Sequence, residues 1–178
     1  MNELFEKKSL PFYKFGDTIY LSKIGTQDWI DYICDRFEAT GKQISKELAK
    51  KICAVADNHS SYVQQLAWLV WIHTDKVATE RDFEAAYQDI IDQNTPLFEK
   101  QTESLTTYQM NFLRAVIEGA HNNLSSHDVL HKYQLGSSAN VSVIKRALVK
   151  KELIDMEKRQ AVIPDPIMKV WLKRELGL

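Results

Sequence analysis

The sequence predicts a mainly α-helical chain in two parts, a four-helix bundle followed by a winged helix-turn-helix with a small β-hairpin. Two observations lead to this prediction. Apolar residues recur at helical spacing through most of the 178 residues, and near residue 153 the period becomes strand-like. The connections between helical segments are short, which favours neighbouring antiparallel helices.

The predicted bundle covers residues 25–94. We expect its four helices to begin near Thr26, near Ser45, near Ser60 or Ser61, and near Thr79. Asp82 stands three residues after Thr79, at the capping-box position. The third helix is apolar nearly all round, so we expect it to be the central helix, with Trp71 in the core.

The predicted winged helix-turn-helix covers residues 105–178. Thr106 and Gln109 form a capping box at its first helix, a second helix opens at Ser125, and Gly136 follows it. We expect the second helix to bury Val129, Leu130 and Tyr133, and the third to bury Val141, Ile144, Leu148 and Val149.

A hairpin then pairs residues 153–157 with 160–163 around a charged turn, Lys158 and Arg159, and forms the wing. Asp165 caps a last helix, which carries Ile167, Val170, Trp171 and Leu172.

Two segments lie outside these parts. Residues 95–104 join the bundle to the winged helix, and we expect them to be partly helical. Within residues 1–24, the stretches 4–5 and 11–15 are aromatic and apolar, and 18–24 alternate like a strand. A lone strand does not stand in water, so its sheet partners must come from elsewhere.

The composition is that of an ordinary globular protein, with 44% apolar and 26% charged residues. No apolar run is long enough for a membrane span, and no signal peptide is recognisable. Cys34 and Cys53 are too few for a disulfide framework, and we interpret them as buried free thiols. We therefore expect a cytoplasmic protein with no membrane partner.

Catalytic motifs are missing from the sequence. It contains no Gly-rich phosphate loop, no G-x-S-x-G elbow and no Cys-x-x-Cys pair. His127 and His131 have the i, i+4 spacing of a zinc-protease helix, but no third ligand is apparent downstream. We interpret both as solvated histidines, and we assign no catalytic residue and no metal site.

The charge is distributed unevenly. Residues 1–103 carry a net charge of −5 and residues 104–178 a net charge of +4. A basic C-terminal part is compatible with a nucleic-acid surface. The DNA-binding candidates are Ser138, Asn140, Ser142, Lys145, Arg146 and Lys150 on the third helix, with Lys158 and Arg159 at the wing. The alternative is a solvated helix on a winged helix that docks a protein.

A second candidate site lies at the start of the central helix and consists of His59, Ser60, Ser61 and Tyr62. Backbone N–H groups at a helix N-terminus suit an anion or the edge of a nucleotide. The residues alone favour a simpler interpretation, in which a serine caps the helix and Tyr62 packs in the core.

The order of several segments along the chain resembles the C-terminal half of prokaryotic AAA+ ATPases of the archaeal-ATPase and STAND-like type. These segments are residues 19–24, 29–33, 41–45, 59–67, 105–109, 135–141, 151–155 and 165–172. The resemblance implies that residues 25–94 are a four-helix AAA+ lid-like bundle, 95–104 a linker, and 105–178 an appended winged helix. Residues 1–24 would be the tail of a nucleotide-binding core.

The resemblance also implies a function. A non-catalytic lid and winged helix would couple the nucleotide state of a P-loop core to binding of double-stranded DNA or a protein. ATP and Mg²⁺ would enter only through that core, with residues 59–62 facing the nucleotide. Ser60 stands where the family has proline. The alternatives are a free-standing winged-helix DNA-binding regulator and a protein-interaction scaffold.

Overall fold

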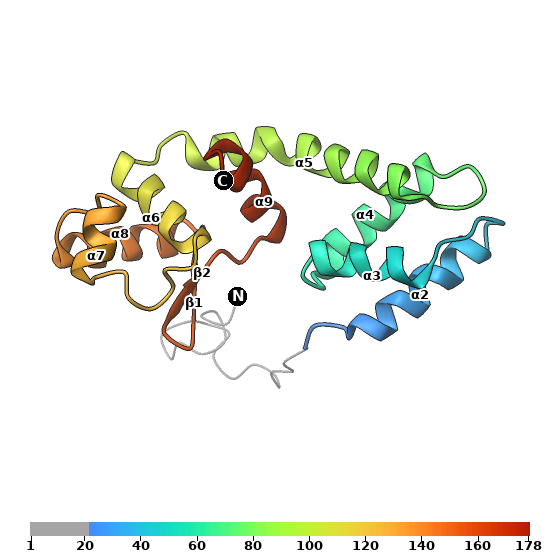
Figure 1. Cartoon of the computed structure of the whole chain (residues 1–178), viewed down its shortest axis with the longest axis horizontal. Helices are drawn as coiled ribbons and strands as arrows, with labels where there is room; N and C mark the ends of the chain where they lie inside the picture. Colours follow the sequence, from blue (N-terminus) through green and yellow to red (C-terminus); the bar gives the residue numbers. More distant parts are fainter. Residues whose placement is uncertain (1–21) are drawn as a thin grey trace, which may run out of the picture.

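The computed structural model describes residues 22–178, which form eight helices and one two-stranded sheet. Figure 1 shows the bundle at one end of the molecule and the winged helix at the other. This architecture confirms the predicted fold class. Residues 22–24 are exposed and irregular, and the rest of the predicted strand over 18–24 lies outside the described residues.

The bundle consists of α2 (Thr26–Glu38), α3 (Lys46–Val55), α4 (Ser60–His73) and α5 (Glu80–Thr102). Their starts agree with the predicted ones, and at α3 and α5 local side-chain caps fix them. The Ser45 hydroxyl accepts from the Leu48 N–H, and Thr79 forms the predicted capping box with Asp82.

Helix α4 lies inside the bundle but is not buried all round. Val63, Leu66, Leu69 and Val70 are buried. Trp68 is 55% exposed and Ile72 is 47% exposed, and Trp71 is only half-buried. The prediction that Trp71 is a core residue was therefore wrong. Apolar composition alone did not reveal that one side of α4 faces solvent.

Helix α5 continues without a break from the bundle to Thr102 and so includes most of the predicted connecting segment. Pro96 lies inside it. Proline has no N–H, so the carbonyl of Asp92 lacks its usual helical donor. The segment 95–104 is partly helical, as predicted.

The winged helix comprises α6 (Thr107–Ile117), α7 (His127–Lys132), α8 (Ser138–Lys150), β1 (Asp155–Glu157), β2 (Gln160–Val162) and α9 (Pro166–Glu175). The strands pair antiparallel, with Met156 opposite Ala161. The capping box of Thr106 with Gln109 is present, as predicted.

Two details of the winged helix differ from the prediction. Helix α7 has Ser126 rather than Ser125 before its first turn, with no side-chain cap, and its Val129 and Leu130 are only half-buried. Fewer than two turns of helix cannot bury a complete apolar face. Val149 is 40% exposed on α8, outside the core that holds Val141, Ile144 and Leu148.

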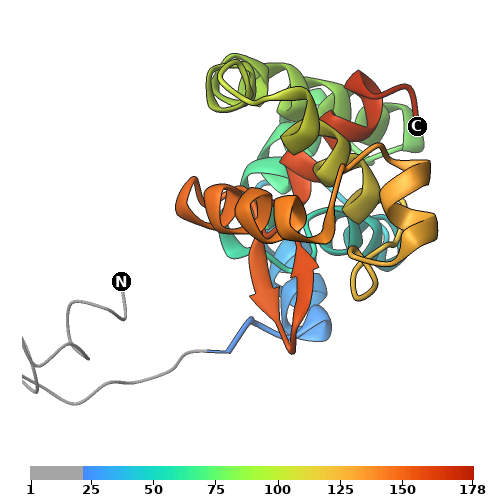
Figure 2. The ribbon, with the colours of Figure 1, turned by 90° about the vertical axis from the view of Figure 1, so that its left-hand side faces the viewer.

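The two parts meet where α9 packs on α5 (Figure 2). The rings of Phe98 on α5 and Trp171 on α9 lie 5.6 Å apart between centroids, and both are buried. The second half of α5 therefore belongs to the core of the winged helix as well as to the bundle. None of the helices in residues 22–178 is both long and apolar enough to cross a membrane.

Candidate functional site

The start of α4 is held by an unusual loop. Asp57 and Asn58 both have positive φ, at 47° and 52°. Asn58 donates from Nδ2 to the Thr26 hydroxyl at 2.9 Å, and Lys23 donates from Nζ to both the carbonyl and a carboxylate oxygen of Asp57 at 2.8 Å. Left-handed backbone at non-glycine residues persists only where its surroundings hold it. These contacts fix the loop against the start of α2.

This loop presents the N-terminus of α4 to solvent. His59 is the N-cap, and its side chain makes no capping hydrogen bond. The side chains of His59, Ser60 and Ser61 are exposed. The first-turn N–H groups are left without a side-chain partner, which is the arrangement expected of a helix end that accepts an anion.

Tyr62, the fourth candidate, faces the winged helix. Its hydroxyl donates to Oδ2 of Asp165 at 2.6 Å, and its ring lies 5.2 Å from the ring of His59. Burial and the neighbouring Asp165 carboxylate raise the pKa of Tyr62 well above its ordinary value. The alternative interpretation of Tyr62 as an ordinary core residue is incomplete, because its hydroxyl joins the two parts.

Asp165 holds two elements at once. Its Oδ1 accepts from the N–H groups of Ile167 and Met168, both at 2.9 Å, which confirms the predicted cap of α9. Its Oδ2 accepts from Tyr62. A hollow of about 330 Å³ lies beside this contact, lined by His59, Ser61, Tyr62, Gln65, Asn94, Pro164 and Asp165. No sequence signal pairs Tyr62 with Asp165, because the contact joins residues far apart in the chain.

The polar candidates on α8 are partly engaged within the helix-turn-helix. Asn140 donates from Nδ2 to the Leu135 carbonyl at 2.9 Å, and its N–H bonds to the Ser137 hydroxyl at 3.2 Å. The Ser142 hydroxyl donates back to the Ser138 carbonyl at 3.4 Å. Asn140 therefore fixes the turn before α8, and this contact engages one of the two N–H groups of its side-chain amide.

The lysines and arginines among the DNA-binding candidates are less engaged in contacts within the described chain. Within residues 22–178, no ion pair involves Lys145, Arg146, Lys150, Lys158 or Arg159. Arg146 and Lys150 are exposed on α8. Lys158 and Arg159 form the tight turn of the wing, with φ of 47° and 73°. Figure 2 shows this hairpin next to α8, so the cations of both elements lie in one part of the winged helix.

His127 and His131 lie side by side on α7, with ring centroids 6.5 Å apart and nearly parallel planes. Within the described residues, no group of three or more His, Cys, Asp or Glu side chains is placed to hold a metal ion.

One charged cluster was not predicted. Glu118, at the end of α6, accepts from Lys132 at 2.8 Å, from the Tyr133 hydroxyl at 3.0 Å and from Arg114 at 3.1 Å. These hydrogen bonds lower the pKa of Glu118 to about 2. The cluster ties α7 to α6. Only the Arg114–Glu118 pair, at i, i+4 spacing, has a local sequence signal.

Comparison with known proteins agrees with this architecture. Residues 96–174 match the model of a family described as a probable winged helix domain. The chain therefore contains a winged helix domain. No curated protein matches the sequence significantly.

Among solved structures, the chain is similar to the Walker-type ATPase PABY2304 of Pyrococcus abyssi, with a TM-score of 0.68 and 13% identity. The similarity covers 94% of this chain and 47% of that protein, so this chain spans about half its length. It confirms, at the level of the fold, the resemblance to the lid-like bundle and winged helix of a prokaryotic ATPase.

Proposed function

We propose that this chain is the non-catalytic lid and winged-helix region of an ATPase, and that it couples the nucleotide state of a P-loop core to binding of DNA. The observation that carries this proposal is the extent of the fold similarity, which covers 94% of the chain rather than the winged helix alone. A free-standing DNA-binding regulator does not require this particular bundle before its winged helix.

The contacts between the two parts support a coupling role. The open N-terminus of α4 accepts phosphate or the nucleotide edge, and Tyr62, in the first turn of the same helix, bonds to Asp165 at the start of α9. A ligand shifts an equilibrium only through different contacts in its two states. A nucleotide that moves the start of α4 changes the Tyr62–Asp165 contact directly.

ATP and Mg²⁺ would be held by the P-loop core, and this chain would contribute the N–H groups of residues 60–62. We also propose a cytoplasmic location. Both cysteines of the chain are free thiols, which suits a reducing compartment.

Double-stranded DNA is the partner that the winged helix favours. Five cations without ion pairs within the described chain lie on α8 and the wing, where winged helices meet phosphates. One observation favours a second candidate, a protein partner. Val143 is 53% exposed and Val149 is 40% exposed on α8, and exposed apolar side chains suit a protein surface better than phosphates.

The experiment that tests the ATPase proposal is an immunoblot of source-cell extract with an antibody against this chain. We expect a product larger by a domain of roughly 150–200 residues. The antibody should also co-precipitate ATP hydrolysis that is lost after a Walker A lysine substitution in the product. A product of 178 residues without associated hydrolysis would contradict the proposal and favour the free-standing regulator.

A further inference from the structure

Helix α8 has one face that is open to solvent. The side chains on its opposite face hold it on the core of the winged helix, and they are Val141, Ile144 and Leu148. A rotation of about 100° per residue places four exposed side chains in one line along the open face. We call this line the α8 stripe, and its members are Ala139, Val143, Arg146 and Lys150.

The chemistry of the α8 stripe changes along the helix. Ala139 and Val143 lie in its first half and present only apolar carbon atoms. Arg146 and Lys150 lie in its second half, and neither forms an ion pair within residues 22–178. In a helix that enters the major groove of DNA, the N-terminal residues contact base edges, and Lys and Arg nearby contact phosphates. The stripe therefore places methyl groups where a recognition helix contacts bases.

The polar side chains in the first half of α8 are partly engaged within the chain. Asn140 is half-buried and donates one amide N–H to the Leu135 carbonyl. The Ser142 hydroxyl donates to a carbonyl of its own helix at 3.4 Å. Val143 is 53% exposed, and it is the largest exposed side chain of residues 138–144. A partner that meets this half of α8 therefore meets Val143.

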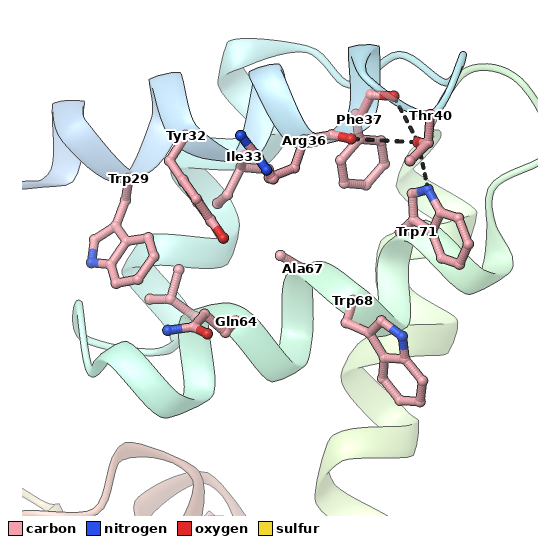
Figure 3. A pocket seen from close by; sticks show the side chains of 11 residues that line it. Trp29, Tyr32, Ile33, Arg36, Phe37, Thr40, Gln64, Ala67, Trp68 and Trp71 are labelled. Carbon is pink, nitrogen blue, oxygen red and sulfur yellow. Dashed lines mark hydrogen bonds between the residues drawn. The ribbon is translucent and has the colours of Figure 1, made fainter.

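The exposed valines of α8 are isolated from each other, unlike the exposed aromatic side chains of the bundle. There, Tyr32 and Trp68 line one groove of about 440 Å³ between α2 and α4 (Figure 3). On α8, Val149 follows Val143 by six positions, so the two side chains project about 120° apart around the helix axis. A lone valine beside cations is small against the roughly 800 Å² that each partner buries in a stable protein interface.

Double-stranded DNA offers an apolar group that fits a lone valine. The C5-methyl group of thymine projects into the major groove, and apolar side chains contact it there. The other three bases lack this methyl group and present hydrogen-bonding groups, for which a valine has neither donor nor acceptor. A valine on the reading face of a helix therefore favours thymine.

We propose that Val143, with Ala139 one turn before it, contacts the C5-methyl group of a thymine in the major groove. Val143 is then a specificity-determining residue, and Arg146 and Lys150 hold the phosphates beside it. This inference rests on the proposed binding of DNA and deepens it, because it names a base that α8 reads. The chain prefers duplexes that have thymine at one fixed position.

The test begins with the full chain and a pool of duplexes of random sequence. Sequencing of the retained duplexes should show thymine enriched at a fixed position. Each thymine of a selected duplex is then replaced by uracil, which keeps the base pair and removes only the methyl group. Fluorescence anisotropy should show binding about fourfold weaker at the position that Val143 contacts, the effect of burying one methyl group.

A substitution at Val143 connects this effect to the side chain. Val143→Ala should weaken binding to the thymine duplex by about fourfold or more. It should also bind the thymine and uracil duplexes equally, because the contact is already lost. Val149→Ala is the matched control, since it removes the other exposed valine of α8 and should keep the full preference for thymine. Both side chains are exposed, so neither substitution opens a cavity in the core.

The contrary results separate this proposal from the binding of DNA itself. If no thymine is enriched, or if uracil binds as well as thymine at every position, then α8 reads no methyl group. If Val143→Ala keeps the full preference for thymine, then another residue reads it. Each of these results overturns the proposal while the binding of DNA stands. If no duplex is retained even at low salt, both proposals fail, and a protein is the partner of α8.

Discussion

Tyr62 and Asp165 are separated by 103 positions in the sequence, and their side chains share a 2.6 Å hydrogen bond between the bundle and the winged helix. The same carboxylate caps α9 through two backbone N–H groups. The contact therefore joins the first turn of α4 to the first turn of α9. We therefore expect a displacement of either helix start to change this contact.

Replacing Tyr62 by phenylalanine tests this contact. We expect Tyr62→Phe to lower the free energy of unfolding by about 0.5–1.5 kcal/mol, the usual contribution of one hydrogen bond. Asp165→Asn should cost less than Asp165→Ala, because asparagine can still cap α9. Urea unfolding gives the free energies, and hydrogen exchange at Ile167 and Met168 shows whether the start of α9 opens. Equal stability and equal exchange in wild type and Tyr62→Phe would contradict the expectation.

The low pKa of Glu118 predicts a specific loss of stability in acid. Its pKa falls from 4.5 to about 2 in the folded chain, through hydrogen bonds from Lys132, Tyr133 and Arg114. A lowered pKa stabilises the folded state above the unfolded pKa, and this contribution is lost as the pH falls from 4.5 toward 2. Glu118→Gln should therefore lose less stability than wild type over this range in urea unfolding at a series of pH values. If the free energy of unfolding fell by the same amount in wild type and Glu118→Gln as the pH is lowered, the hydrogen bonds to Glu118 would not be its cause.

Gly136 is a position where both backbone and space limit substitution. Its φ is +77°, and an added Cβ would lie 3.3 Å from Nδ2 of Asn140, the amide that fixes the turn before α8. Gly136→Ala should destabilise the chain by about 1–3 kcal/mol in urea. Gly119→Ala is the matched control, because its φ is +97° and nothing lies within 4 Å of the added Cβ. An equal cost for both variants would mean that the Asn140 contact has no effect.

Binding of the winged helix to DNA can be tested by its dependence on salt. Arg146→Ala or Lys158→Ala should weaken binding about equally on all duplex sequences, and each should flatten the slope of log K against log salt by about 1. Lys50→Ala, an exposed lysine on α3, is the control and should leave the slope unchanged. Fluorescence anisotropy with labelled duplexes measures both quantities. Unchanged affinity for all variants would exclude these side chains from the interface.

The two tryptophans Trp71 and Trp171 should differ in their contribution to stability. Trp171 is 4% exposed and packs on Phe98, so Trp171→Ala should cost about 3–5 kcal/mol. Trp71 is half-buried, with Lys42 4.2 Å from its ring centroid and its Nε1 bonded to the Thr40 hydroxyl at 2.9 Å. We expect Trp71→Ala to cost roughly half as much. Equal losses in urea unfolding would show that exposure does not separate the two sites.

The sequence was most informative where structure depends on neighbours in the chain. The caps at Ser45, Thr79, Thr106 and Asp165 and the turn of the wing were all predicted, because each depends on residues within a few positions. The helix order and the hairpin followed from periodicity. These features are sufficient to predict the fold class.

Features that depend on distant residues were not predicted. Tyr62 finds its acceptor in another part of the chain, and no spacing rule connects the two residues. Trp68 and Trp71 belong to the same uninterrupted apolar run as Leu69 and Val70, so only packing against α2 and α5 separates the exposed side chains from the buried ones. The engagement of Asn140 with the Leu135 carbonyl likewise required the geometry of the turn.

Helix α5 is continuous from the bundle to the winged helix, so a rotation at one end displaces the other end. With 23 residues it is about 34 Å long, and a tilt of roughly 10° at the bundle end would displace the other end by about 6 Å. The contact between Phe98 and Trp171 attaches α9 to the second half of α5. Arg174 on α9 also forms an ion pair with Asp92 at 3.6 Å, one helical turn before Pro96. A small rotation of the bundle would thus reach the winged helix as a movement comparable to one turn of helix.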